Sequence, residues 1–368
     1  MNERITKTRK RLLKEELDAF FITNQSNVMY LSGFPGLNPN EREAFILLTK
    51  KSGYFITFPT YSGLFKKEIN GLEVLSITLK KRLSDFLKEI AAEDKIKTIG
   101  FEKNNLTVGE LEKLKKDIKV KWKKTEGIVE EIRVYKDEDG LNKIKLACNR
   151  ADKAFNFILQ EIKEGISEKE LSLKLEYYIK KIADDISFTP IVAFNENAAV
   201  PHYLSSANIK LKINSLILID FGTKVDGYCS DMTRVVFFGK ATKEQKRAYE
   251  TVLKAQTEVI NEFIGWSDLQ KGPTFSGKKM DEIARKIITD NGYPEYQHGL
   301  GHGIGIDVHE DPRLSTRKDY QLKPRMVFTI EPGVYLPGKF GIRIEDTVAL
   351  TEKGLEILTN STKRTIEL

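Results

Sequence analysis

The chain has 368 residues, of which 40% are hydrophobic, an ordinary composition for a globular protein. At roughly 150 residues per domain this length predicts about two domains, each able to bury a core without disulfides, which excludes a disordered chain and a small stapled scaffold. The formal net charge of +7 is spread along the chain. We interpret it as a solvated surface, and the basic run 119–124 as an exposed strand or helix face, so a nucleic-acid partner is not expected.

The cysteines and the apolar segments indicate a cellular compartment. Cys148 and Cys229 are far apart and form no CxxC pair, which argues against a disulfide framework and a thiolate zinc site and favours a reducing environment. The first 17 residues are charged throughout, unlike a signal peptide, and no later stretch reaches the ~18 apolar residues of a membrane span. We therefore expect a cytoplasmic protein with no membrane partner.

Helix and strand patterns alternate in the first part of the chain. Strands are predicted at 19–22, 44–49, 54–58, 73–77 and 98–101, and helices at 5–17, 83–92 and 108–116. The charged, weakly patterned stretch 122–139 suggests a link between domains. We accordingly expect a smaller α/β domain over residues 1–125 and a second domain over residues 126–368.

The second domain is predicted to be α+β. Long helical patterns cover residues 139–162 and 167–182, and Ser167 with Glu170 three residues later forms a capping-box signal. From about residue 190 onward, β-branched runs and hairpin signals alternate with two further helices, at 243–263 and 279–291.

Three of the four histidines, His298, His302 and His309, lie within residues 298–309, interleaved with glycines. The glycines disfavour a helix and suggest a backbone that packs closely against something the imidazoles contact. His298 and His302 would be neighbours on either a helix or a strand. Neutral imidazole binds metals and also exchanges protons near pH 7, so one histidine could serve a metal and another the substrate.

Asp220 and Asp231 occupy a predicted hairpin in which Asp220 ends a run of buried aliphatic residues. A turn centred on Asp226-Gly227 pairs position 220 with 233 and position 222 with 231. The two aspartates would then be diagonal neighbours on one sheet face, roughly 7–8 Å apart. A turn centred one residue earlier would place them directly opposite, and in both registers they can bind the same pair of ions.

Glu331 and Glu345 form a second acidic pair, at the end of one predicted strand and in the middle of another. Arg343, two residues before Glu345, is expected to orient that carboxylate or to pair with Asp231. Four carboxylates on apolar strands require multivalent cations or raised pKa values. With one imidazole they form an oxygen-rich set that suits two Mn(II), Co(II) or Fe(II) ions, which can activate a shared water.

Other catalytic motifs are incomplete. The glycines from Gly301 begin a GxGxxG pattern that Ile306 breaks, Tyr228 replaces the lysine of a P-loop spacing, and Arg313 replaces the second histidine of HExxH. A GxSxG elbow is absent from the sequence. Hydride transfer, nucleotide hydrolysis and serine catalysis therefore have no support.

The five candidate ligands occur in the settings LIDFG, GYCSDMTR, HGLGHGIG, TIEPGVY and GIRIEDT. In this order they resemble the pita-bread metallopeptidases, specifically the proline-specific branch of Xaa-Pro aminopeptidases and Xaa-Pro dipeptidases. The segments NVMYLSGFPG and IGFEKNNLT look like the creatinase-type N-terminal domain of that branch. The resemblance implies a pita-bread catalytic domain after a smaller α/β domain, although residues 266–277 form a longer link than usual.

The resemblance also implies a role for each ligand. Asp220 would bind one ion in bidentate fashion, Asp231 and Glu345 would bridge both ions, and His302 and Glu331 would bind the other ion. Glu331 would also transfer the proton of the nucleophilic water. The two divalent ions are expected to be Mn(II), with Co(II), Fe(II) or Zn(II) as alternatives.

His202, His298 and His309 match substrate-side histidines that position the scissile carbonyl and stabilise the developing oxyanion. Arg313 is a candidate for binding a substrate carboxylate, and a solvent-facing arginine is an equal alternative.

The resemblance predicts a cytoplasmic homodimer that acts on peptides with proline in the second position and cleaves the bond before that proline. An enzyme restricted to Xaa-Pro dipeptides is the alternative. A non-enzymatic pita-bread binding protein would be expected to have lost ligands that this sequence retains. Metal analysis would separate the enzyme from the binding protein.

Overall fold

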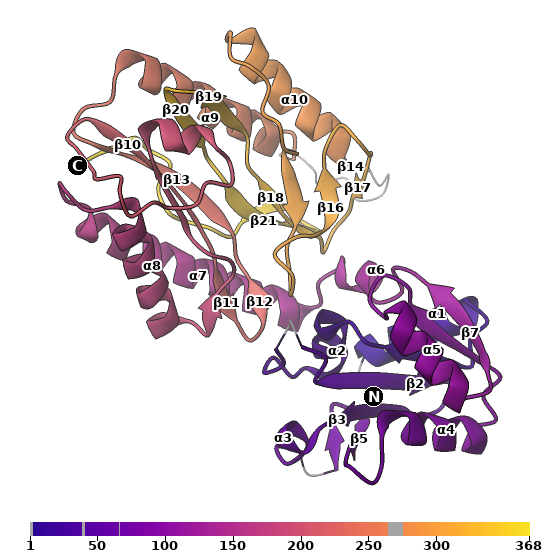
Figure 1. Ribbon diagram of the computed structural model, residues 1–368. Coiled ribbons are helices and arrows are strands. Elements are labelled where there is room, and N and C mark those ends of the chain that lie inside the picture. The colour runs from indigo at the N-terminus through magenta and orange to yellow at the C-terminus, as the bar shows by residue number, and fades with distance from the viewer. Residues whose placement is uncertain (1–2, 39–40, 66, 264–274) are drawn as a thin grey trace. The chain divides into compact units, whose positions relative to one another are not determined.

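The computed structural model describes residues 3–38, 41–65, 67–263 and 275–368, and the chain divides into two compact units, Met1–Arg133 and Val134–Leu368 (Figure 1). The division falls after Arg133, a little beyond residue 125, which is where the sequence predicts the first domain to end. The longer link expected at residues 266–277 lies largely outside the described residues. No helix among the described residues is both long and apolar enough to cross a membrane.

The first unit is built on a mixed sheet with the strand order β4-β5-β3-β2-β1-β6-β7. Its strands are β1 (Ala19–Ile22), β2 (Ala44–Thr49), β3 (Gly53–Thr57), β4 (Glu68–Ile69), β5 (Leu72–Ser76), β6 (Thr98–Glu102) and β7 (Lys121–Thr125). The basic run predicted to be an exposed face lies largely in β7, which pairs with β6 in parallel. The start of the stretch that the sequence assigned to a link thus contributes an edge strand, whose Trp122 packs against Phe21 and Phe101 in the core.

Helices connect the strands of this sheet, and α4 and α5 pack their apolar side chains against it. They are α1 (Glu3–Lys14), α2 (Gln25–Ser32), α3 (Pro59–Ser62), α4 (Leu83–Glu93), α5 (Val108–Asp117) and α6 (Glu130–Arg133). The sequence analysis missed α2, a short helix that begins where the Asn24 side chain accepts from the Asn27 amide and ends at Gly33 with φ 72°.

The second unit combines several small sheets, in the orders β23-β13-β10-β9, β12-β11-β8, β14-β17, β16-β15-β18-β21-β22 and β19-β20. Their strands are β8 (Asp185–Ile186), β9 (Ile191–Phe194), β10 (Ser215–Phe221), β11 (Thr223–Val225), β12 (Tyr228–Cys229), β13 (Met232–Phe238), β14 (Phe275–Ser276), β15 (Gly301–Gly303), β16 (Glu310–Leu314), β17 (Gln321–Leu322), β18 (Val327–Ile330), β19 (Gly333–Leu336), β20 (Phe340–Arg343), β21 (Asp346–Thr351), β22 (Gly354–Ile357) and β23 (Ile366–Glu367). This mixture confirms the predicted α+β class.

Two helical layers cover these sheets, with α7 and α8 on one side and α9 and α10 on the other (Figure 1). The helices are α7 (Glu138–Glu161), α8 (Glu168–Ile182), the 3-10 helix η1 (Asn195–Ala199), α9 (Lys243–Asn261) and α10 (Gly277–Asp290). The capping box predicted at Ser167 and Glu170 is present at the start of α8.

Strand β10 shows why the central strands contain almost no polar residues. Leu216 and Leu218 pack into the cluster formed with α9 and α10, whereas Ile217 and Ile219 pack into the cluster formed with α7 and α8. A strand covered on both faces buries every side chain, so its sequence is a continuous apolar run. Asp220 interrupts that run just before the strand ends.

Candidate active site

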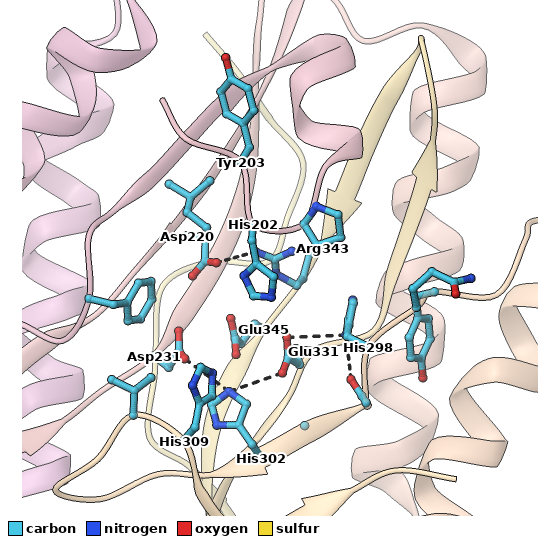
Figure 2. A pocket seen from close by; sticks show the side chains of 18 of the residues that line it. His202, Tyr203, Asp220, Asp231, His298, His302, His309, Glu331, Arg343 and Glu345 are labelled. Carbon is cyan, nitrogen blue, oxygen red and sulfur yellow. Dashed lines mark hydrogen bonds and ion pairs between the residues drawn. The ribbon is translucent and has the colours of Figure 1, made fainter. Parts of the chain in front are cut away.

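A cavity of about 1080 Å³ opens in the second unit, and every candidate residue from the sequence lines it (Figure 2). The lining includes the acids and histidines proposed for the metals and the residues proposed for substrate: His202, Asp220, Asp231, His298, His302, His309, Arg313, Glu331, Arg343 and Glu345. Groups that are distant in sequence are therefore neighbours in space.

The predicted hairpin register that carries Asp220 and Asp231 is confirmed. Asp220 pairs with Thr233, and the register continues through Val225 and Tyr228 to the turn. Asp226 and Gly227 have φ angles of 46° and 78°, and two successive positive values are the signature of a type I′ hairpin turn. Asp231 therefore lies just before β13, close to the end of β10.

His302 lies in β15, between β16 and β18. The close approach suggested by the surrounding glycines is to these neighbouring strands. A Cβ atom at Gly301 would overlap the carbonyl oxygen of Thr329, and one at Gly303 would overlap that of Asp311. The glycines thus allow three strands to pack tightly around the histidine, and the helical alternative for residues 298–302 is wrong.

Glu345 lies between β20 and β21, and not in the middle of one strand as expected. β20 pairs with β19, whereas β21 pairs with β18, so the chain changes sheets at Ile344 and Glu345. At this corner the Glu345 amide donates to the Thr233 carbonyl, and the Thr233 hydroxyl donates to Glu345 Oε2 at 2.7 Å. The corner directs the carboxylate into the cavity.

One buried side-chain amide, that of Gln256, links the backbone segments that carry Glu331 and Glu345. Gln256, in the middle of α9, donates through Nε2 to the carbonyls of Ile330 at 3.0 Å and Ile344 at 3.2 Å. These carbonyls belong to the residues immediately before Glu331 and Glu345. Gln256 is fully buried, and within the described chain its Oε1 has no hydrogen-bond partner. The side chain therefore acts as a clamp behind the two acids.

The donor atoms converge as a metal site requires. Atoms of Asp231, His302 and Glu345 all lie within 4.8 Å of one another. His302 Nε2 is 3.6 Å from Asp231 Oδ2 and 3.5 Å from Glu331 Oε1, which is longer than a good hydrogen bond. Asp220 Oδ1 and Asp231 Oδ1 are buried and have no hydrogen-bond partner in the described part of the chain. Such orphaned acceptors fit a cation that fills their valences.

Burial and mutual repulsion raise the pKa values of the acids. Desolvation first, and then the neighbouring carboxylates, raise the pKa of Asp231 and Glu331 well above the usual range. The same causes raise the pKa of Glu345 to about 8. Burial lowers the pKa of His302 to about 3, so its imidazole is neutral at pH 7 and can bind a metal.

Arg343 pairs with Asp220 and not with Asp231, and it reaches the Glu345 carboxylate only through the Thr233 hydroxyl, which donates to Glu345 Oε2. Its Nη2 donates to Asp220 Oδ2 at 2.5 Å and its Nε to the Thr233 hydroxyl at 3.0 Å. The expectation assumed that Arg343 and Glu345 share one strand face, which the change of sheets removes. The arginine occupies one oxygen of Asp220, and the other, Oδ1, has no partner in the described part of the chain and stays available to a cation.

Tyr335 is a site residue that the sequence analysis missed. Its hydroxyl lies 2.9 Å from His298 Nε2 and accepts from Arg343 Nη1 at 2.8 Å. His298 Nδ1 faces the Gly299 carbonyl at 2.7 Å, which makes Nδ1 the donor and leaves Nε2 to accept from the tyrosine. The only signal available was register: a hairpin turn near Gly338 places Tyr335 on the same face as Arg343.

A second network holds His298 from α10. Arg285 Nη2 donates to the His298 carbonyl at 2.6 Å, and Tyr296 stacks on the His298 ring at 4.9 Å between centroids. Asp281 accepts from Arg285 Nε at 3.0 Å and from the Tyr296 hydroxyl at 2.8 Å. Burial lowers the pKa of His298 to about 4, so its ring is neutral. These residues fix a neutral imidazole beside Glu331.

The remaining substrate-side candidates are more exposed. His309 lies edge-on to His302, with ring centroids 4.4 Å apart. Arg313, in β16, is exposed, and within the described chain its guanidinium has no hydrogen-bond or ion-pair partner. A free cation at the rim can take a substrate anion without first losing an internal partner.

The acids and histidines that converge in this cavity form a donor set suited to metal ions, and similarity to known proteins identifies the class as a metallopeptidase. Residues 142–352 match the metallopeptidase family M24, and residues 4–135 match the creatinase/prolidase N-terminal domain. The chain belongs to the metallopeptidase family M24, and its second unit has the pita-bread fold. Membership of this family implies a requirement for divalent metal ions.

Similar proteins along the full length of the chain include peptidases whose names specify a proline-containing substrate. The Xaa-Pro dipeptidase of Pyrococcus horikoshii is 35% identical, with 100% of this chain and 99% of that protein covered. The structure of the Xaa-Pro dipeptidase from Bacillus anthracis matches with a TM-score of 0.91 at 33% identity, covering 100% of this chain and 99% of that one. The structure of the X-Pro aminopeptidase from Thermotoga maritima matches with a TM-score of 0.88 at 34% identity, covering 98% and 99%.

Proposed function

We propose that this chain is an Xaa-Pro dipeptidase, which hydrolyses the bond between the two residues of a dipeptide that ends in proline. The observation that carries the proposal is the full-length similarity to an Xaa-Pro dipeptidase. The sequence analysis favoured an aminopeptidase acting on longer peptides and kept the dipeptidase as its alternative. The relatives favour that alternative, and the free Arg313 at the cavity rim is suited to a carboxylate that directly follows the scissile bond.

In this proposal Asp220 would hold one divalent ion, His302 and Glu331 would hold a second, and Asp231 and Glu345 would contribute to both. The convergence of donor atoms and the two orphaned aspartate oxygens support this set. When bound, such ions supply Lewis acidity toward the scissile carbonyl and activate the attacking water. We propose Mn(II), with Co(II), Fe(II) or Zn(II) as alternatives, because the donors are mostly carboxylates.

Side chains of the protein would then bind the substrate and transfer protons. Glu331 accepts a proton from the attacking water and delivers it to the prolyl nitrogen as the C–N bond breaks, which releases an amino acid and free proline. His202 and His309 orient the carbonyl and donate to the oxyanion as it forms. His298 lines the same cavity, but its Nδ1 donates to the Gly299 carbonyl and its Nε2 accepts from Tyr335, so it positions the substrate without donating to the oxyanion. Arg343 and Tyr335 keep Asp220 and His298 in place through their hydrogen bonds. A homodimer and a cytoplasmic location stay predictions from the sequence.

The preference for dipeptides tests the proposal directly. We expect kcat/KM for an Xaa-Pro dipeptide to exceed that for the Xaa-Pro-Yaa tripeptide by about tenfold or more, since one charge-assisted hydrogen bond contributes about 1.5–3 kcal/mol. Arg313→Met should remove this preference, mainly by raising KM for the dipeptide. Steady-state kinetics with both peptides provide the measurement.

Arg317→Met is the matched control, because Arg317 is another exposed cation that lines the cavity. It should leave the ratio between the two peptides unchanged. Faster cleavage of the tripeptide, with Arg313→Met behaving like the wild type, would identify an aminopeptidase instead.

Metal removal should affect both activity and stability. Chelation with EDTA is expected to abolish hydrolysis and to lower Tm, because the clustered carboxylates then repel one another without counter-ions. At a metal concentration of 100 Kd, binding would add about 2.7 kcal/mol to the free energy of unfolding. Thermal denaturation with and without EDTA measures the effect, and EDTA presaturated with Mn(II) is the control. An equal Tm with and without EDTA would contradict the proposed metal centre.

A further inference from the structure

His202 reaches the cavity without an anchor of its own. The residue is exposed, and its ring has no hydrogen-bond partner in the described ranges. Figure 2 shows His202 directed toward the acidic side chains, whereas the adjacent Tyr203 points away from them. The position of the imidazole therefore depends on what holds its backbone segment, residues 194–206, between β9 and β10.

Glu168, the first residue of α8, is fully buried and binds this segment on both sides of His202. Its Oε1 accepts from the Phe194 amide at 2.7 Å and from Asn197 Nδ2 at 2.8 Å, both before the histidine. Its Oε2 accepts from the Tyr203 hydroxyl at 2.8 Å and from the Ser206 amide at 3.1 Å, both after it. One carboxylate thus divides its two oxygens between the two arms of the segment.

All four donors are uncharged, and within the described chain no cation forms an ion pair with this carboxylate. The Tyr203 hydroxyl also accepts from Asn197 Nδ2 at 2.9 Å, which ties the two arms to each other. Burial and the bond to Glu168 raise the pKa of Tyr203 to about 12, so the phenol remains a donor. The α8 backbone adds a further attachment, because the Lys169 amide donates to the Ser206 carbonyl at 3.2 Å.

We propose that Glu168 is a positioning residue, which clamps both arms of segment 194–206 and thereby holds His202 against the substrate carbonyl. The inference rests on the proposed function, in which His202 touches the substrate. Glu168 itself lies outside the cavity lining.

Glutamine at this position cannot reproduce the clamp. A glutamine amide has one acceptor oxygen, and its NH₂ group would face donors in either orientation. It would face the Phe194 backbone amide if turned one way and the Ser206 backbone amide if turned the other way, and a backbone amide can only donate. Glu168→Gln therefore releases one arm while it preserves side-chain size.

A double-mutant cycle with His202 tests the clamp. Glu168→Gln should lower kcat for an Xaa-Pro dipeptide by about a hundredfold with little change in KM, the cost of misplacing a reacting-site group by about 1 Å. In a His202→Ala background the same change should cost less than about twofold, because a residue that acts through His202 has nothing left to position. Equal losses in the two backgrounds would overturn the proposal.

Glu170→Gln is the matched control. Glu170 lies in the same turn of α8, but its carboxylate accepts from Ser167 and Lys210 and not from segment 194–206. It should change kcat in neither background. If Glu168→Gln does not fold, Tyr203→Phe provides the same cycle with one donor removed, and it should give a smaller loss that also vanishes without His202.

Hydrogen exchange separates this inference from the proposed function. In Glu168→Gln, amides of segment 194–206 should exchange faster, while those of β10 and the bound metal content should match the wild type. Unchanged exchange in the segment would overturn the clamp. A wild-type protein that hydrolyses no Xaa-Pro peptide would overturn the role of His202, and exchange would still decide whether Glu168 holds the segment.

Discussion

Asp231→Asn is expected to lower kcat/KM for an Xaa-Pro dipeptide by about 10³-fold or more, because metal ions contribute several kcal/mol to transition-state stabilisation. The substitution keeps the shape of the side chain and removes the charge that would bridge two ions. Asp231 is the acid with one oxygen beside His302 and the other without a partner. Metal content per chain should fall as well. Steady-state kinetics and elemental analysis of the purified variant give the two measurements.

Asp311→Asn is the control for this substitution, since Asp311 is exposed and lines the same cavity. It removes an equal charge without touching the proposed ligands, and its kcat/KM should stay within about threefold of the wild type, which corresponds to less than 1 kcal/mol. Turnover by Asp231→Asn close to the wild-type value would rule out this cavity as the catalytic site.

Asp346→Asn should have the largest effect on stability, lowering the free energy of unfolding by about 3–5 kcal/mol. Arg234 Nη2 donates to Asp346 Oδ1 at 2.7 Å, and the two side chains are 1% and 0% exposed. Burial would raise the pKa of Asp346, but Arg234 and Lys363 outweigh it and lower that pKa. Without the carboxylate, Arg234 would stay buried with no counter-charge. Urea denaturation of the metal-free protein measures the loss.

Glu356→Gln is the matched control, because Glu356 forms an exposed ion pair with Lys145 at 2.7 Å. Exposed pairs contribute about 0–1 kcal/mol, so this variant should unfold almost like the wild type. Similar losses in both variants would mean that the buried pair provides no special stability.

Local sequence patterns predicted most helices and strands, and they indicated which residues would come together in the site. The Asp226-Gly227 turn was sufficient for the β10–β13 register, because the turn fixes which residues of such a hairpin pair. The capping box at Ser167 likewise depends on residues within one turn. The clustering of His298, His302 and His309 in the sequence was already a sign of a site.

Features that depend on long-range pairing could not be predicted in this way. The ion pair between Arg343 and Asp220 was missed because the change of sheets at Glu345 depends on which strands β20 and β21 pair with. Tyr335 and Glu168 were missed since each acts through hydrogen bonds to residues distant in sequence. A periodicity argument describes one element at a time and contains no information on such contacts.

The amide of Gln256 has a consequence for the choice of ion. It joins the carbonyls of Ile330 and Ile344 from a helix, and it does not line the cavity. These hydrogen bonds accordingly fix the spacing of the two backbone segments that carry Glu331 and Glu345. If Glu331 and Glu345 hold the ions as proposed, Gln256 would influence which ion radius fits from a helix that supplies no ligand itself.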